Sequence, residues 1–274
     1  MQIDRSCTIR SRDGTRLAVS ETGNRNGKPL LLIHGIAQSR LCFRKQTSSK
    51  LAERFRIVSF DLRGHGESDK PREAKAYTEG GRWADDVAAV IEHARLERPV
   101  LVGWSLGGRV IAQYLAICGD SAIAGINFVG SRTIIDPQKS TLGPGASHLV
   151  AMHSEDLATC IKATANFLKS CVAEPLPVDD LIYMMGYNMA SPWYARASIL
   201  KWPGDFSKAL SSVSVPCLVT HGRRDNVILP AAAELTAMHV PYAKLSWYEE
   251  SGHSPFWEEP DRFNSELAEL ADRC

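Results

Sequence analysis

A short strand, a tight turn and a helix follow one another in residues 98–118, RPVLVGWSLGGRVIAQYLAIC. Residues 99–102 form an apolar, β-branched run typical of a buried parallel strand. From Leu106 to Cys118 the apolar residues recur at three- and four-residue steps, which is helical spacing, and Gly119 ends the pattern. This order of elements indicates a strand-turn-helix unit of an α/β protein.

The turn itself reads Gly103-Trp104-Ser105-Leu106-Gly107, a G-x-S-x-G sequence. Glycines allow a turn so tight that the serine backbone is strained and its hydroxyl is raised at the end of the strand, beside the first free amides of the helix. The five-residue pattern alone arises by chance in about one chain in ten of this length, given a glycine frequency of about 7%. Its position between strand and helix therefore carries the prediction that Ser105 is a nucleophile rather than part of an ordinary Gly/Ser turn.

Strand and helix patterns alternate through most of the chain. An opening hairpin is predicted at residues 7–9 and 17–21, and helices at 39–55 and 78–96. Buried strands are predicted at residues 28–33, 56–61, 99–102, 123–129, 215–222 and 244–248. Such alternation implies a mostly parallel sheet with right-handed crossovers and helices on both faces, with ligands bound at the carboxyl ends of the strands. Ser105 follows one of those ends.

The alternation lapses in residues 131–208, where helical patterns appear near 155–171 and 178–190. We interpret this segment as a helical cap inserted after the sixth strand, with residues 1–130 and 209–274 forming the core. Its charges balance, and it is rich in methionine and aromatic side chains, which suit a deformable apolar pocket. We expect Met184 and Trp193 of the cap, with Trp104 of the turn, to contact substrate. The alternative is that these side chains only fill the seam between cap and core.

The composition excludes several classes of protein. A net charge of +1 on 274 residues, 23% of them charged, gives no field for collecting nucleic acid or anionic membranes. No apolar run approaches the roughly 20 residues of a membrane span, and the N-terminal residues do not resemble a signal peptide. The seven cysteines are scattered without C-x-x-C spacing. We therefore expect a cytoplasmic protein, a monomer or homodimer, without disulfides, metal or nucleic-acid partner.

A serine nucleophile needs a base and a carboxylate to orient that base. Asp225 follows the predicted strand at 215–222, and His253 follows the strand at 244–248, so both lie at the carboxyl edge of the sheet. Asp136 is the alternative acid, and Asp225 could instead cap a helix or pair with a neighbouring arginine. His221 precedes Asp225 too closely along the chain to be oriented by it easily.

These motifs together resemble the α/β-hydrolase-fold proteins: His34-Gly35 after the third strand, Asp61-Leu62-Arg63-Gly64-His65-Gly66 after the fourth, the G-x-S-x-G turn, and Gly252-His253 near the end. The chain order Ser105, Asp225, His253 is that of this family. The resemblance extends over both ends of the chain, and is nearest to cap-bearing carboxylesterases, including the pimeloyl-ester esterases and the cofactor-free haloperoxidase-like esterases. It implies an eight-stranded, mostly parallel sheet with an inserted cap. It also implies an oxyanion hole made by the backbone amides of Ile36 and Leu106.

The sequence thus predicts a serine hydrolase that cleaves a carboxylic ester of a small to medium, largely apolar small molecule through an acyl-enzyme, with no cofactor. Haloalkane dehalogenases and epoxide hydrolases of this fold carry aspartate where Ser105 stands, which argues against both activities. The loop at 35–39 lacks the proline that accompanies perhydrolase activity. Lactone or carbon-carbon bond hydrolysis by the same three residues stays open, and a slow-turnover ligand receptor is a remoter alternative.

Overall fold

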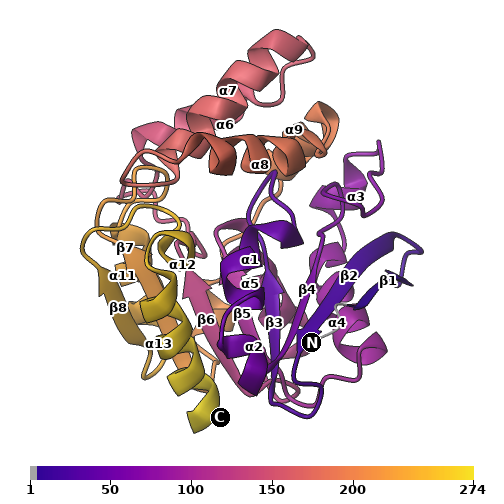
Figure 1. Ribbon diagram of the computed structural model, residues 1–274, viewed down its shortest axis with the longest axis vertical. Coiled ribbons are helices and arrows are strands. Elements are labelled where there is room, and N and C mark those ends of the chain that lie inside the picture. The colour runs from indigo at the N-terminus through magenta and orange to yellow at the C-terminus, as the bar shows by residue number, and fades with distance from the viewer. Residues whose placement is uncertain (1–4) are drawn as a thin grey trace.

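The computed structural model describes residues 5–274 and contains one eight-stranded sheet (Figure 1). The strand order is β1-β2-β4-β3-β5-β6-β7-β8, in which β2 runs antiparallel to both β1 and β4 and all other pairs are parallel. The strands are β1 Arg5–Arg10, β2 Arg16–Gly23, β3 Pro29–Ile33, β4 Arg56–Phe60, β5 Val100–Trp104, β6 Gly125–Val129, β7 Cys217–Gly222 and β8 Lys244–Tyr248. The predicted opening hairpin and the mostly parallel sheet are both confirmed.

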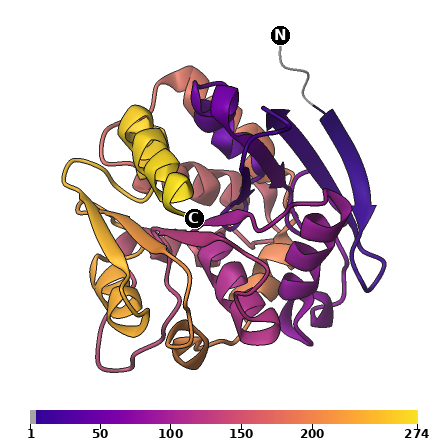
Figure 2. The same ribbon diagram turned by 90° about the horizontal axis from the view of Figure 1, so that it is seen from below.

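Helices cover both faces of the sheet, which Figure 2 shows from below, with the yellow helix α13 on one side and magenta helices on the other. One face carries α4 Arg82–His93, α5 Leu106–Cys118, α10 Ser207–Leu210 and α11 Ala231–His239. The other carries α1 Arg44–Thr47, α2 Leu51–Arg54, α12 Pro255–Glu258 and α13 Pro260–Arg273. Both faces are therefore shielded from water, as a parallel sheet requires.

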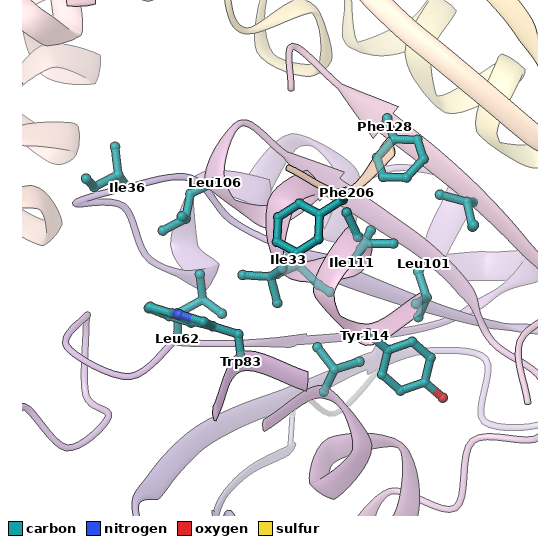
Figure 3. Close-up of a cluster of buried hydrophobic side chains, with 14 of the residues drawn as sticks. Ile33, Ile36, Leu62, Trp83, Leu101, Leu106, Ile111, Tyr114, Phe128 and Phe206 are labelled. Atoms are coloured by element: carbon teal, nitrogen blue, oxygen red, sulfur yellow. The ribbon is translucent and has the colours of Figure 1, made fainter. Parts of the chain in front are cut away.

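The strands divide their side chains between two apolar cores. Leu31 and Ile33 of β3 point into the core beneath α4 and α5, whereas Leu30 and Leu32 point into the core beneath α13. Successive side chains of a strand face opposite sides of the sheet, so a strand buried on both sides must be apolar throughout. Figure 3 shows the first of these cores, where Ile33 and Ile111 lie among Trp83, Leu101 and Leu106.

Two predicted helices are shorter than the sequence pattern indicated. The helix expected at 39–55 is broken into a 3-10 turn, η1 Arg40–Phe43, and the short helices α1 and α2. The hydroxyls of Ser48 and Ser49 donate to the carbonyls of Arg44 and Gln46, and these local bonds compete with a continuous helix. In place of the helix expected at 78–96 the structure has α3 Lys75–Thr78 and α4. Gly80 and Gly81, which lie between these two helices, both have a positive φ and interrupt the helical conformation.

Residues 144–200 supply the turn η2 Pro144–Ser147 and four helices: α6 His148–Ala151, α7 Leu157–Ser170, α8 Val178–Met189 and α9 Trp193–Leu200. These four helices lie together at one end of the sheet (Figure 1). Asn188 of α8 donates to Gln38 in the loop after β3, and Tyr194 of α9 donates to the carbonyl of Lys70 beyond β4. The four helices therefore cover the carboxyl ends of the strands, where Ser105 lies.

The predicted boundary at residue 208 falls inside α10, which packs against α5 and α11 of the core. We therefore place the end of the cap before α10, and the division into cap and core stays our interpretation. Among the helices described between residues 5 and 274, none combines the length and apolar character needed to cross a membrane.

Candidate active site

Ser105 occupies the turn between β5 and α5 with φ 53° and ψ −112°. A positive φ is rare for any residue other than glycine, and such strained residues concentrate at functional sites. The amide of Ser105 donates to the carbonyl of Val129 at 2.8 Å, and its own carbonyl accepts from the amide of Gly108 at 3.1 Å. The turn thus holds the serine backbone by hydrogen bonds to β6 and to the first turn of α5.

Two glycines make this turn possible because the chain segments touch. A Cβ atom at Gly107 would lie 2.1 Å from the carbonyl oxygen of Ile33, and one at Gly103 would lie 2.6 Å from the backbone of Gly107. No side chain larger than hydrogen fits at either position without moving backbone. The G-x-S-x-G pattern is therefore a packing requirement that brings α5 against the ends of β3 and β5.

Asp225 and His253 meet at the same edge of the sheet, in the loops after β7 and β8. His253 Nδ1 lies 2.8 Å from Asp225 Oδ2, and both side chains are buried. Asp225 Oδ1 accepts from the amides of Val227 and Ile228 at 2.8 and 2.9 Å. Because a carboxylate oxygen only accepts, the shared proton is on Nδ1 and the lone pair of the neutral ring is on Nε2.

The pKa of Asp225 is held well below its ordinary value, although burial by itself would raise it. The interactions with His253 and with His221 outweigh the cost of burial, since His253 donates to the carboxylate and the ring nitrogen of His221 lies 3.2 Å from it. Asp225 is therefore an anion at neutral pH, which is the charge needed to orient an imidazole and stabilise an imidazolium.

The ring of His253 lies beside the serine turn. The backbone carbonyl of His253 accepts a hydrogen bond from Trp104 Nε1 at 2.8 Å, and a Cβ at Gly130 would lie 3.1 Å from His253 Nδ1. Gly130 directly follows Val129, whose carbonyl binds the amide of Ser105. Within residues 5–274, His253 Nε2 is buried and has no hydrogen-bond partner, so it is not bonded to the Ser105 hydroxyl. Such bonds are often long in unliganded enzymes and shorten when substrate binds.

Two amides beside Ser105 are available as hydrogen-bond donors. Leu106 N is the first amide of α5, and Ile36 N lies in the loop after β3; neither makes a hydrogen bond to another residue in the described part of the chain. A Cβ at Gly35 would lie only 3.2 Å from Ser105 Cβ, so this loop passes directly over the serine. The two predicted oxyanion-hole residues thus belong to segments that meet at Ser105.

His34 and His65 fasten the loop that carries Ile36. His34 donates from Nδ1 to the carbonyl of Gly35 and accepts from Leu62 N at 3.0 Å. His65 donates from Nδ1 to Arg63 O and accepts from Ala37 N at 3.0 Å. Burial lowers the pKa of each ring to about 3, so both are neutral. Since both nitrogens of each ring are occupied, neither histidine can serve as the base.

The sequence left open three alternatives, which concern Asp136, the arginines beside Asp225, and His221. Asp136 binds only its own loop, through the amide of Gln138, and does not reach His253. The neighbouring arginines do not pair with Asp225, because Arg224 pairs with Glu174 and Glu250 and Arg223 with Glu249. His221 was expected to lie too near Asp225 along the chain to be oriented by it, and this expectation is wrong. His221 Nε2 lies 3.2 Å from Asp225 Oδ2, because the chain reverses direction at Gly222 and brings the carboxylate back over the strand end.

A small enclosed cavity lies between the serine turn and the cap, with room for about one water molecule. Its wall includes Trp104 and Met184, two of the predicted substrate contacts, together with Gln38 and Tyr187. The third, Trp193, does not line this cavity; it is 38% exposed at the start of α9 and its ring lies against Tyr194. Tyr187 belongs to the aromatic side chains of the cap that were expected to suit an apolar pocket, whereas nothing in the sequence pointed to Gln38.

All seven cysteines carry free thiols, and within residues 5–274 no cluster of three or more histidine, cysteine or acidic side chains is arranged to hold a metal ion. Serine, histidine and aspartate are thus the chemical groups that this edge of the sheet brings together.

Comparisons with known proteins agree with the fold of the sheet and its helices. The model of the alpha/beta hydrolase family matches residues 30–266. An AB hydrolase superfamily protein of Bacillus subtilis is 26% identical over 96% of this chain and 98% of its own, and a pimeloyl-[acyl-carrier protein] methyl ester esterase of Vibrio cholerae is 27% identical over 90% and 95%.

Among solved structures, a putative aryl esterase from Burkholderia cenocepacia superposes with a TM-score of 0.93 at 36% identity, covering 98% of each chain. The esterase RhEst1 from Rhodococcus sp. gives 0.91 at 33% identity, covering 97% of this chain and 98% of its own. The match to the family model over most of the sequence and the eight-stranded sheet together identify the protein as a member of the alpha/beta hydrolase family.

Proposed function

We propose that this protein is a serine carboxylic-ester hydrolase. The observation that carries the proposal is the hydrogen bond from His253 Nδ1 to the Asp225 carboxylate, which leaves the Nε2 lone pair of a buried ring unpartnered beside the strained turn at Ser105. An oriented base next to a raised hydroxyl is what acyl transfer requires. The relatives and solved structures described as esterases support ester hydrolysis.

In the proposed mechanism, His253 Nε2 takes the proton of Ser105 as Oγ attacks the ester carbonyl. Asp225 stabilises the imidazolium, and the amides of Ile36 and Leu106 donate to the oxygen that becomes negative. The tetrahedral intermediate collapses, the carbon-oxygen bond to the alcohol breaks, and His253 returns its proton to the leaving oxygen. Water, deprotonated by the same nitrogen, then releases the acid from the acyl-enzyme.

The cavity beside Trp104 sets the expected size of the acyl group. It has room for about one water molecule, and its walls are mainly apolar and aromatic. Even an acetyl group is larger than one water molecule, so every acyl chain must displace part of the wall, such as the side chain of Met184, and a longer chain must displace more of it. A small, largely apolar ester is the substrate class that follows.

A series of p-nitrophenyl esters from acetate to decanoate tests this function. The wild-type protein should hydrolyse acetate with the highest kcat/KM, and Met184→Ala should move the optimum toward longer chains. Ser105→Ala should abolish turnover, and Asp225→Asn should lower kcat by several orders of magnitude because the wrong tautomer of His253 is favoured. Asp136→Asn, the matched control, should keep wild-type rates. Full activity of Ser105→Ala would contradict the proposed function.

A cytoplasmic location and a monomeric or homodimeric state stay predictions.

A further inference from the structure

His221, at the end of β7, is a second histidine in contact with the proposed acid. Its ring is fully buried, and Nε2 lies 2.8 Å from the carbonyl oxygen of Ile228 and 3.2 Å from Asp225 Oδ2. Its ring packs against Trp247 of β8, with the ring centroids 6.1 Å apart. His221 therefore bridges the strand, the carboxylate and the far side of the loop that carries the carboxylate.

The proton of this ring can be placed from the contacts. A carbonyl oxygen only accepts hydrogen bonds, so the short contact to Ile228 requires the hydrogen on Nε2. The other nitrogen, Nδ1, is buried and has no partner in the described part of the chain. The one N–H of His221 is therefore bonded to the carbonyl of Ile228, and the same nitrogen lies 3.2 Å from Oδ2 of Asp225.

Oδ2 is the same oxygen that accepts from His253 Nδ1. Asp225 thus accepts two backbone amides on Oδ1 and the ring N–H of His253 on Oδ2, and the His221 ring lies against Oδ2 as well. These three hydrogen bonds and the close imidazole contact fix the plane of the carboxylate. The donor from His221 also draws part of the negative charge of Oδ2 away from His253.

We propose that His221 is a positioning residue that acts through Asp225: its N–H holds the carboxylate in the plane that His253 needs, and it sets how strongly that carboxylate stabilises the imidazolium. The inference rests on the proposed function. Other titratable groups near Asp225 are the thiol of Cys171 and the carboxyl of Glu258, and the pKa of each is raised by burial and by the charge of Asp225. Glu258 accepts from the backbone amides of Gly252 and Ala173, and neither group contacts His221.

Substitutions of His221 separate positioning from a purely structural role. His221→Phe keeps a planar ring but removes the donor, whereas the amide nitrogen of His221→Gln can occupy nearly the place of Nε2 and keep it. For the Phe variant we expect kcat to fall about tenfold, since the carboxylate loses one of its donors. We also expect the acid limb of the pH profile of kcat/KM to move to higher pH by about half a unit to one unit. Without His221, the full negative charge of Asp225 acts on His253 and raises the pKa of that base. The Gln variant should recover most of both properties.

Thr220→Val is the matched control, because Thr220 is the neighbouring buried residue of β7, on the opposite face of the sheet, and donates to Asn127 at 2.9 Å. It should lower the melting temperature without moving the pH profile. If the Phe variant does not fold, His221→Asn, whose amide is too short to reach Oδ2, replaces it in the comparison with Gln. Wild-type kcat and an unmoved acid limb in His221→Phe, or equal losses in the Phe and Gln variants, would overturn the inference. The proposed function would stand in both cases as long as Ser105→Ala is inactive.

Discussion

Arg63 is a fully buried charge in the loop after β4, and it is paired on both sides. Its guanidinium binds both oxygens of Asp86, which is also buried, and donates to Asp13 at 2.9 Å. It also donates to the carbonyl of Ala76. A buried guanidinium with unpaired donors would be costly, so the two carboxylates and the carbonyl together keep this loop in place beside His65.

Asp13 gives this cluster a measurable dependence on pH. Burial alone would raise its pKa, but the bonds to Arg63 and Thr15 lower it from 3.8 to about 2. Because the folded pKa lies below the unfolded value, the interaction stabilises the fold fully above pH 3.8 and is lost as the pH falls toward 2. Asp13 has an exposed backbone and a side chain that is 17% exposed, so we discount the full shift and expect about 1 kcal/mol.

We therefore expect Asp13→Asn to lower the free energy of unfolding at pH 7 by about 1 kcal/mol and to lose less stability on acidification than the wild type. Urea unfolding at pH 7, 5 and 3 measures both effects. Glu97→Gln, at an exposed position with no ion-pair partner among residues 5–274, is the control and should follow the wild type. Parallel stability curves for wild type and Asp13→Asn would show that Asp13 contributes nothing through its charge.

The three proposed catalytic residues, Ser105, Asp225 and His253, could be predicted from the sequence. Each follows a recognisable strand, and their order along the chain is characteristic of the family. Their contact with His221 could not be predicted. Whether two side chains four positions apart meet depends on the exact course of the turn at Gly222, where the amide of Asp225 binds back to the carbonyl of Gly222. Residue spacing alone does not contain that geometry.

Arg196 of α9 holds the cap helices together. Its guanidinium is buried and pairs with no carboxylate among residues 5–274. It donates instead to the carbonyls of Met152, after α6, and Asn188, near the end of α8, and to the hydroxyl of Thr164 on α7. The ends of helices α6 and α8 carry unsatisfied carbonyls and partial negative charge, so a cation between them is favourable. Burial lowers the pKa of Arg196, and these acceptors offset part of the cost.

We predict that Arg196→Lys destabilises the cap by about 2 kcal/mol, because one ammonium cannot reach acceptors on three helices and leaves buried carbonyls unpaired. Hydrogen exchange should become faster in residues 148–200 and stay unchanged in β3, β5 and β6. Arg72→Lys is the control. Among the described residues, the Arg72 guanidinium contacts the ring of Tyr194, which lies on α9 like Arg196, at 4.9 Å from the ring centroid. Unchanged exchange throughout the cap would contradict this role for Arg196.

The cap also shows which helices could be predicted from the sequence and which could not. Helices α7 and α8 carry clear apolar periodicity and were predicted to within a few residues. Helix α9, with the sequence WYARASIL, has no apolar stripe and was missed. Its conformation depends on tertiary contacts, those of Arg196 above all, and a window of sequence cannot register them.

The cap and the core meet through side chains that lie far apart in the sequence. Arg44 of α1 pairs with Asp180 of α8, and its guanidinium lies 4.6 Å from the ring centroid of Tyr183 and 4.7 Å from that of Trp257. The amides of Gln38 and Asn188 form a second, buried contact. The sequence led us to expect a cap, but neither contact could be predicted, because the angle at which α8 crosses the core is set by packing of the whole molecule.

Loosening the contact at Arg44 should widen the range of substrates, because α8 carries Asp180 and Tyr183 and also Met184, which lines the cavity. For Arg44→Met we expect a loss of about 1 kcal/mol in stability, from one half-exposed ion pair and two cation-π contacts. We also expect a several-fold rise in kcat/KM for p-nitrophenyl hexanoate relative to acetate.

Asp180→Asn should have a smaller effect in the same direction, and the double variant should show coupling between the two positions, since they share one interaction. Arg54→Met is the control. Arg54 pairs with Asp272 and lies 5.0 Å from the ring centroid of Phe55, so it makes the same kinds of contact wholly within the core. A loss of stability in both arginine variants, with the shift in chain-length preference confined to Arg44→Met, would show that the position of α8 controls access to the cavity. Equal preferences in all variants would mean that the cap moves independently of this contact.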